Sequence, residues 1–392
     1  MKKKTELKAL IVISSVAVFV AVFALGCGGT SNPTGSAYKV GVVLSASGPN
    51  APLGQSEQQS LLLLEKQVNA NGGINGHPLD IIIEDDASDP AKAATAAAKL
   101  INQDQVSALI GSSGTGPTLA IVPVVDKAKV PLISMAAGTK ITSPVDPLVF
   151  RTPPSDSMAI TRVLTYLKNT LKVKKIAILH DSNAFGTGGA DELSAKAPKY
   201  GITVVARESY GSADTDMTAQ LTKIQGTPAQ AIVVWGTNPG PASIAKNMQQ
   251  LGMTIPYIGS HGIANKKFIE LAGTAANGVV FPAGKLLVPA SIPAGSDWSK
   301  AVNDFSAAYK KEYQMDIDTF AAHGYDAGSI IVEAMKKAGT DSTKLRDQIE
   351  QTAGLAGVDG VYTYSPTNHD GLSVADLTMI KINNGAWVEA KQ

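Results

Sequence analysis

The sequence predicts an α/β protein built from two doubly wound parallel sheets. Short runs of β-branched residues alternate with longer helical patterns along most of the chain, which is typical of a parallel sheet covered by helices on both faces. The pattern restarts after Arg151-Thr152-Pro153-Pro154, so the chain divides into two halves of similar architecture. Setting aside an apolar leader of 26 residues leaves 366 of the 392 residues. That length is comfortable for two domains of roughly 100–200 residues each.

The first half begins with four short apolar runs that we expect to be strands. These runs are residues 40–44, 79–84, 106–110 and 131–134. Helical patterns separate them at residues 54–71, 89–103 and 115–129. The first helix ends at Gly72-Gly73, as a C-cap requires, and the second starts with the N-cap acid and first-turn proline of Asp89-Pro90.

The second half repeats this alternation and then changes character. A helix over 156–171 leads into strands expected at 175–180, 202–208, 231–235, 255–258 and 279–281. Three helices follow, at 298–313, 319–337 and 342–352, with too few strands to form a domain of their own. We therefore expect these helices to complete the first half. A final hairpin is expected to pair residues 361–364 with 375–383.

Residues 1–26 have the pattern of a lipoprotein signal peptide. Four lysines precede an uncharged run over residues 9–25 that is apolar except for Ser14 and Ser15, and Cys27 is the only cysteine of the chain. The segment resembles the lipobox of bacterial lipoproteins, whose cysteine thiol receives diacylglycerol, although Ala24 stands where leucine is commoner. The alternative is an uncleaved transmembrane anchor, because the run approaches the roughly 18 apolar residues that span a bilayer. Both interpretations place the remaining chain outside the cytoplasm and attached to a membrane.

The composition excludes several classes of partner. Without the four lysines and one glutamate of the leader, the chain has 30 basic and 32 acidic residues, a net charge of −2. A nearly neutral chain without a basic run offers no electrostatic footprint for nucleic acid. Residues 27–37, rich in Gly, Ser, Thr and Pro, are expected to form a flexible tether. With Cys27 lipidated no disulfide is possible, so burial of the core must supply the stability.

The familiar motifs of enzymes and metal sites do not occur in the sequence. It contains no Gly-x-Ser-x-Gly elbow, no His-Glu-x-x-His and no free cysteine nucleophile. Asp85, Asp86 and Asp89 lack the spacing of a calcium loop, so a turn followed by a helix cap is expected there. We therefore expect no enzymatic activity, no metal and no cofactor. Catalytic groups that converge from distant segments are the alternative, and turnover in a hydrolase panel would establish it.

The most specific local feature is the segment 110–118, Ile-Gly-Ser-Ser-Gly-Thr-Gly-Pro-Thr. It follows an expected strand and opens an expected helix, whose first turn leaves about four N–H groups unpaired and favours an anion. Ligands of open α/β sheets bind at such strand ends. A nucleotide is excluded because the Gly-x-Gly-x-x-Gly spacing and a following lysine are absent. The segment predicts an anion site around Gly114 and Thr115, or alternatively an ordinary glycine-rich turn with Thr115 as N-cap.

Seven motifs agree in order and spacing with one known family. They are Val40-Gly41 to Ser47-Gly48-Pro49, Asn71-Gly72-Gly73-Ile74-Asn75-Gly76, Asp85-Asp86-Ala87-Ser88-Asp89-Pro90, the Gly111 segment, His180-Asp181, His261-Gly262-Ile263-Ala264-Asn265 and Gly324-Tyr325-Asp326-Ala327. Over residues 38–390 the chain thus resembles the leucine/isoleucine/valine-binding proteins. These are type I periplasmic binding proteins that deliver solutes to ABC importers.

The resemblance implies two lobes that close on a solute. Lobe one would comprise residues 38–152 with 283–361, and lobe two residues 153–282 with 362–392. The three crossovers would lie near Thr152, Pro282 and Tyr362, and an ABC permease in the inner membrane would recognise the closed form. The same fold could instead serve a ligand-sensing receptor. The residues do not separate these two roles, whereas neighbouring permease or kinase genes would.

The resemblance also implies which residues bind the solute. Thr115 matches the serine that binds an amino acid's carboxylate, and Ala136 matches the alanine whose carbonyl accepts from the ammonium group. Phe185 matches a tyrosine above the ligand, and Leu53 matches an aromatic residue near the cleft mouth. Trp235 ends an expected strand and is expected either to face the cleft or to lie beneath a neighbouring helix.

Two positions depart from the family pattern. Gly138 stands where a threonine contacts both polar groups of the ligand, although the adjacent Thr139 could replace it. His261 stands where an acidic side chain pairs with the ammonium, and a histidine cannot supply that negative charge. Phe320 and His323 could border the pocket, but core or surface roles are the stronger expectation. Hydrophobic amino acids are narrowly the expected solutes, ahead of aromatic or aliphatic monocarboxylates without an amino group.

Overall fold

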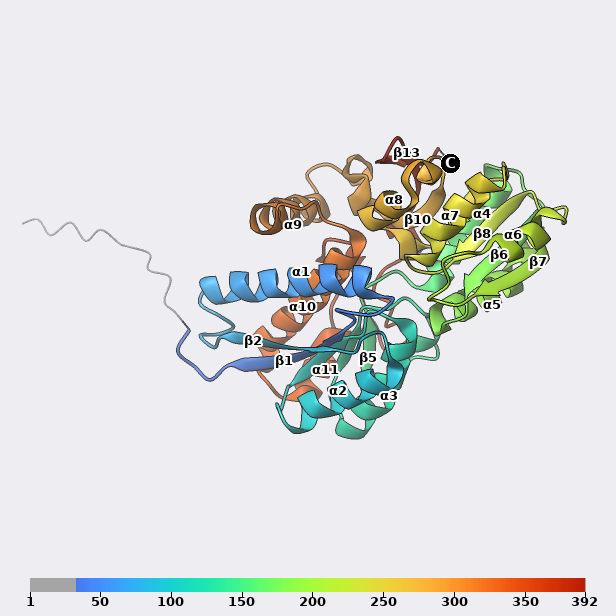
Figure 1. Cartoon of the computed structure of the whole chain (residues 1–392). Helices are drawn as coiled ribbons and strands as arrows, with labels where there is room; N and C mark the ends of the chain where they lie inside the picture. The colour runs from blue at the N-terminus through green and yellow to red at the C-terminus, as the bar shows by residue number, and fades with distance from the viewer. Residues whose placement is uncertain (1–32, 392) are drawn as a thin grey trace, which may run out of the picture.

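The structure, a computed structural model, describes residues 33–391. The predicted signal peptide, the lipidation site at Cys27 and the start of the tether lie outside the described residues. Figure 1 shows two α/β bodies side by side, each built around its own sheet. Within residues 33–391 no helix is both long enough and apolar enough to cross a membrane.

The first sheet has five parallel strands in the order β2-β1-β3-β4-β5. The strands are β1 (Tyr38–Leu44), β2 (Leu79–Asp85), β3 (Ala108–Gly111), β4 (Leu132–Ser134) and β5 (Val149–Arg151). Four of them are the predicted strands. The strand β5 was not among the predicted strands.

Helices cover both faces of the first sheet. On one face α1 (Ala51–Ala70), α10 (Thr319–Ala338) and α11 (Ser342–Glu350) share an apolar core with β1, β2 and β3. On the other face lie α2 (Pro90–Asn102) and α3 (Thr115–Ala128). The helix α9 (Asp297–Tyr313) lies against α1, where Tyr309 donates a hydrogen bond to Gln59. The helices α10 and α11 therefore pack with the first half of the chain, as the shortage of strands predicted, whereas the buried apolar residues of α9 join a core that also includes residues of the second sheet.

The second sheet has seven strands in the order β14-β13-β10-β9-β8-β6-β7. They are β6 (Lys175–Asp181), β7 (Thr203–Tyr210), β8 (Ala231–Trp235), β9 (Tyr257–Gly259), β10 (Val280–Gly284), β13 (Leu377–Asn383) and β14 (Ala386–Glu389). The helices α4 (Asp156–Asn169) and α5 (Ala184–Lys196) cover one face. The helices α6 (Thr218–Gln225), α7 (Gly240–Gln250) and α8 (Lys266–Ala272) cover the other. The sheet is parallel except for the antiparallel β13 and β14.

The predicted hairpin between residues 361–364 and 375–383 is wrong. The strand β13 pairs with β10 on one side and with β14 on the other. Residues Val361–Tyr362 form β12 and pair with β11 (Leu355–Ala356) instead. An alternation of apolar and polar residues predicts a strand but does not indicate which other strand it pairs with. The better signal was Asn384-Gly385 between β13 and β14, because both residues have the positive φ of a tight hairpin turn.

The third crossover, which was predicted near Tyr362, lies later in the chain. The Tyr364 hydroxyl donates to the Arg151 carbonyl at 2.8 Å, and the His369 ring stacks on Phe150 with 4.0 Å between centroids. Leu372 still belongs to the core of the first sheet, whereas β13 belongs to the second. Residues 363–372 therefore contact the first sheet, and the chain crosses between Leu372 and Leu377.

Candidate ligand-binding site

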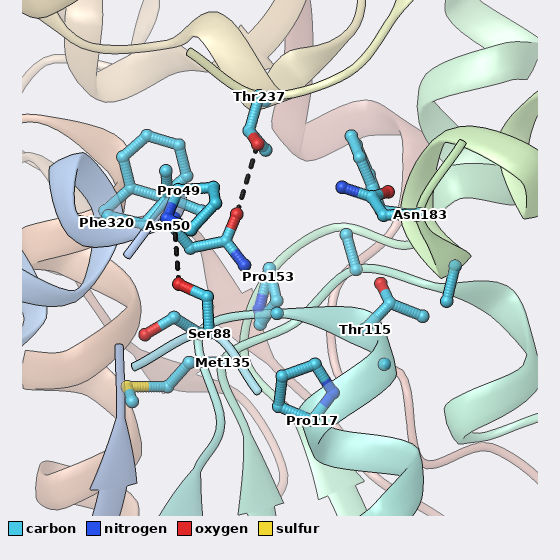
Figure 2. A pocket seen from close by; sticks show the side chains of 18 of the residues that line it. Pro49, Asn50, Ser88, Thr115, Pro117, Met135, Pro153, Asn183, Thr237 and Phe320 are labelled. Carbon is cyan, nitrogen blue, oxygen red and sulfur yellow. Dashed lines mark hydrogen bonds between the residues drawn. The ribbon is translucent and has the colours of Figure 1, made fainter. Parts of the chain in front are cut away.

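A cavity of about 250 Å³ lies between the carboxyl ends of the two sheets. Its walls are loops and helix starts that follow all five strands of the first sheet and β6, β7, β8 and β9 in the second, together with the start of α10. In Figure 2 Thr237 and Asn183, from the second sheet, face Thr115, Pro117 and Met135 from the first. This position is where open α/β sheets bind ligands. None of the described residues that line it is Asp, Glu, Lys or Arg.

Hydrogen bonds between the two bodies close the cavity. The Thr237 hydroxyl donates to the Asn50 side-chain oxygen at 3.2 Å (Figure 2), and the Asn265 amide donates to the Pro52 carbonyl at 3.2 Å. A third contact joins Thr139, after β4, to Glu192 on α5 at 2.7 Å. The structure therefore has the two bodies drawn together around the cavity.

The Gly111 segment forms one wall of the cavity, and its central residue is Thr115. The helix α3 begins at Thr115, and its N-cap is Gly114, which has no side chain to cap the helix. The alternative in which Thr115 caps the helix is thus wrong. The Thr115 side chain is 6% exposed and its Oγ1 is buried without a hydrogen-bond partner. A buried hydroxyl without a partner is costly unless a ligand satisfies it.

Two buried carboxyl groups support the Gly111 segment from behind. Asp86 accepts hydrogen bonds from the Ser45 hydroxyl at 2.7 Å, the Ser88 amide at 2.8 Å and the Ser112 hydroxyl. Asp86 therefore ties the ends of β1 and β3 to the turn after β2. Asp89 accepts from the amides of the first turn of α2, so the predicted helix cap is confirmed.

The second supporting carboxyl group belongs to Glu57 of α1. It accepts a hydrogen bond from the Ser113 hydroxyl, which in turn accepts from the Ser45 amide at 3.0 Å. Burial raises the pKa of Glu57 well above its ordinary value, because water no longer stabilises the charged form. Among residues 33–391 no group of three or more His, Cys, Asp or Glu residues is placed to hold a metal ion.

Two histidines from different bodies line the cavity. His261 is 6% and His323 is 3% exposed, and all four of their ring nitrogens are buried without a hydrogen-bond partner. Burial, followed by repulsion from His323 and Arg151, lowers the pKa of His261 from 6.5 to about 3. His261 is therefore neutral at ordinary pH. The Nε2 atom of His323 lies 3.2 Å from Oδ2 of Asp359, on the loop before β12.

Five of the nine predicted site residues line this cavity, and four do not. The five are Leu53, Gly114, Thr115, Phe185 and His261. Ala136 is buried but does not line it, and its carbonyl accepts from the Ser134 hydroxyl at 3.3 Å. The neighbouring Ala137 takes the place on the wall that was predicted for Ala136.

Gly138 and Thr139 line an adjoining cavity of about 480 Å³ instead. The two cavities share Thr115 and Ala184, and Asp156 lines the adjoining one. Thr139 therefore does not replace the missing threonine on the wall of the first cavity. Gly138 still bears on the first cavity through Thr115, because a Cβ at position 138 would lie 2.3 Å from Cγ2 of Thr115.

The prediction that Trp235 faces the cleft is wrong. Its side chain is fully buried beneath Phe185 and His261, at ring-centroid distances of 6.1 and 5.8 Å. The indole Nε1 donates to Oδ1 of Asp156 at 3.2 Å, and Gly189 of α5 leaves room for the ring. Both faces of a central parallel strand are buried, so the sequence pattern does not say which way a strand residue points.

Several cavity residues were missed. Asn50, Ser113, Met135, Asn183, Ser212 and Thr237 all line the cavity. They could have been predicted from the sequence, since each stands in a loop that follows a strand, where ligands of such sheets bind. Phe320 and His323 are both buried and also line the cavity, so the alternative that they border the pocket holds.

Comparison with known proteins identifies the family. A family model described as periplasmic binding protein matches residues 37–386. The leucine-, isoleucine-, valine-, threonine- and alanine-binding protein of Pseudomonas aeruginosa is 28% identical over 330 residues, 82% of this chain and 85% of the relative. A Leu/Ile/Val-binding protein homologue of Brucella melitensis is 26% identical over 89% of this chain and 92% of its own length.

Solved structures agree with this assignment. An extracellular ligand-binding receptor of Rhodopseudomonas palustris has a TM-score of 0.85 and 30% identity, covering 90% of this chain and 99% of the other. The branched-chain amino acid transporter substrate-binding protein of Streptococcus pneumoniae, solved with isoleucine, has a TM-score of 0.80 and 28% identity, covering 90% and 100%.

The chain therefore belongs to the periplasmic binding protein family, to which the Leu/Ile/Val-binding proteins belong, and it has the type I fold. Both predictions are confirmed.

Proposed function

We propose that this protein is the extracytoplasmic substrate-binding component of an ABC importer, and that it captures a small apolar solute by its carboxylate. The observation that carries the proposal is the Thr115 hydroxyl. It is buried without a partner at the start of α3, inside a cavity that both bodies enclose. A carboxylate placed there accepts from this hydroxyl and from the first amides of α3, where the helix dipole favours negative charge.

The remaining walls suit an apolar body. Leu53, Met135, Phe185 and Phe320 contribute aliphatic, thioether and aromatic surface from four different elements. Binding is expected from desolvation of this surface, with the polar groups fixing orientation. The lining offers neither a nucleophile paired with a base nor a metal ligand set, so binding without turnover is the proposed activity.

Closure of two lobes is the proposed mechanism. Lobe one comprises residues 38–152 and 283–361 with the following segment to Leu372, and lobe two comprises residues 153–282 and the chain from β13 onward. A solute that contacts both lobes favours the closed form, which the membrane permease then recognises. We further propose that a diacylglycerol group on Cys27 anchors the protein outside the cytoplasm. Mass spectrometry of the mature N-terminal peptide from the membrane fraction tests this anchor.

Calorimetry and solution scattering test the binding function. The chain from Gly28 onward should bind a hydrophobic amino acid or an apolar monocarboxylate with a Kd of about 1 μM, or about −8 kcal/mol. Small-angle scattering should show a smaller radius of gyration at saturation. If no carboxylate in the panel binds, the proposed solute class is wrong; if one binds without compaction, the closure mechanism is wrong.

Sensing is the second candidate role, and it is favoured by the 30% identity to a protein described as an extracellular ligand-binding receptor. Uptake of radiolabelled solute separates the two roles. Deleting the gene should abolish high-affinity uptake if the protein serves an importer. Unchanged uptake together with a lost transcriptional response would establish the sensing role instead.

A further inference from the structure

The cavity lining holds no negative charge that could pair with an ammonium group. Its polar side chains are Asn50, Ser88, Ser113, Thr115, Asn183, Ser212, Thr237, His261 and His323, and none of them is a carboxylate. A buried ammonium without a counter-charge loses its hydration and gains no ion pair in return. An amino acid is therefore poorly matched to this cavity.

Two nearby carboxyl groups, those of Asp156 and Glu57, are already engaged, and a third, that of Asp359, faces His323. Asp156 lies 3.8 Å from Nε2 of His261, but it accepts from the Trp235 indole and does not line the cavity. Glu57 accepts from Ser113 and lies behind the cavity wall. Burial raises the pKa of both groups well above the ordinary value, which favours their neutral forms. Neither is placed as the counter-charge of a cationic solute.

Two imidazoles line the cavity in place of such a carboxylate. His261 comes from the loop after β9 in the second sheet, and His323 comes from α10 on the first sheet. His323 Nε2 faces Asp359 at 3.2 Å, and an N–H at this position would leave Nδ1 as an acceptor. His261 is neutral, so it has one ring nitrogen that donates and one that accepts.

We propose that the solute carries a neutral hydroxyl group, bound between His261 and His323, in addition to its carboxylate, and that it carries no ammonium group. A hydroxyl is the group that completes this pair, because it donates to the acceptor nitrogen of one imidazole and accepts from the N–H of the other. This inference rests on the proposed function and narrows its solute class to apolar hydroxycarboxylates. The contact also joins the two bodies, so it favours the closed form.

Solutes that differ in a single group test the proposal. Three sets suit calorimetry with the chain from Gly28 onward: leucine, 2-hydroxy-4-methylpentanoate and 4-methylpentanoate; phenylalanine, 3-phenyllactate and 3-phenylpropionate; and tyrosine with 3-(4-hydroxyphenyl)propionate. In at least one set the hydroxy acid should bind about tenfold or more tightly than both its amino and its unsubstituted counterpart, a ratio equal to about 1.4 kcal/mol. In the third set 3-phenylpropionate serves as the unsubstituted counterpart.

Variants then locate the hydroxyl. In His261→Leu and in His323→Leu the ratio of the affinities for the hydroxy acid and the unsubstituted acid should fall from about tenfold to about one, whatever the absolute affinity of the variant. His261→Gln, which keeps a donor and an acceptor, should restore part of the preference. His77→Leu is the matched control, since His77 bonds to Ser36 and stacks on Tyr38 away from the cavity.

The outcomes are distinguishable from failure of the proposed function. Tighter binding of the amino acids, or equal binding of hydroxy and unsubstituted acids by the unmodified protein, overturns the inference and leaves carboxylate capture standing. A preference that survives both leucine variants overturns the histidine site. If no member of any set binds, the proposed solute class itself fails.

Discussion

The Thr115 hydroxyl offers the most direct test of how the protein binds its solute. Thr115→Val keeps the size and shape of the side chain and replaces the hydroxyl with a methyl group. If that hydroxyl donates to a solute carboxylate, its loss removes one charge-assisted hydrogen bond, worth about 1.5–3 kcal/mol. The Kd should therefore rise by a factor of roughly 10 to 150.

The stability of the Thr115→Val variant should move differently from its affinity. Oγ1 has no partner in the protein, so its removal costs no hydrogen bond, and the N-cap is Gly114. The unfolding midpoint in denaturant should stay the same or rise. The contrasting variant is Thr118→Val, three residues along α3. Thr118 accepts from the Ser112 amide at 2.9 Å, so its loss should cost about 1–3 kcal/mol of stability.

Isothermal titration with the tightest solute of the panel measures the affinity, and urea titration measures the stability. Thr115→Ser, which keeps the hydroxyl, should bind within about threefold of the unmodified protein. An affinity of Thr115→Val within twofold of the original would refute the reasoning, because the only unpartnered hydroxyl at the start of α3 among the described residues would then not touch the solute.

Three further predictions follow from individual contacts. Gly138→Ala should weaken solute binding by about tenfold or more, because its Cβ would lie 2.3 Å from Cγ2 of Thr115. The matched Gly188→Ala meets no atom within 4 Å and should only stabilise α5, by about 0.5–1 kcal/mol; equal affinities in the two variants would contradict this.

The pKa of His261 falls from 6.5 to about 3 on folding. Between these pH values the unfolded chain therefore binds a proton at His261 that the folded protein does not bind. The free energy of unfolding should therefore fall as pH drops below 6.5. His261→Gln should remove a loss on the order of 3 kcal/mol at about pH 4.5, and pH curves that run parallel in the two proteins would contradict this. Thr139→Ala and Glu192→Ala should show a coupling energy of about 1 kcal/mol for solute binding in a double-mutant cycle, and additive effects would mean that their contact does not favour closure.

The elements could be predicted from the sequence because their signals are local. The helix N-cap at Asp89 and the strand ahead of Gly111 depend on a few adjacent residues, and both formed as expected. The hairpin of β13 failed because strand pairing joins distant segments, and Asn384-Gly385 alone carried local information about it.

The candidate site was predictable only in part, for the same reason. Thr115 could be placed because a glycine-rich segment between a strand and a helix has a known direction. His323 could not, since its place on the cavity wall depends on α10 packing against β1, β2 and β3, which lie more than 200 residues earlier in the chain. The direction in which Trp235 points was likewise set by tertiary packing under Phe185, which no local pattern encodes.

The hydrogen bonds between the two bodies have a consequence for the rate at which a solute escapes. Thr237 and Asn50 join the bodies at one place, and Thr139 and Glu192 join them at another, while the cavity lies between the sheets. A bound solute therefore leaves only after these contacts break. Its residence time should follow the opening rate of the protein, so solutes of quite different affinity should dissociate at similar rates whenever opening is the slow step. An importer supplied by such a protein would receive its cargo at a pace set by the hinge.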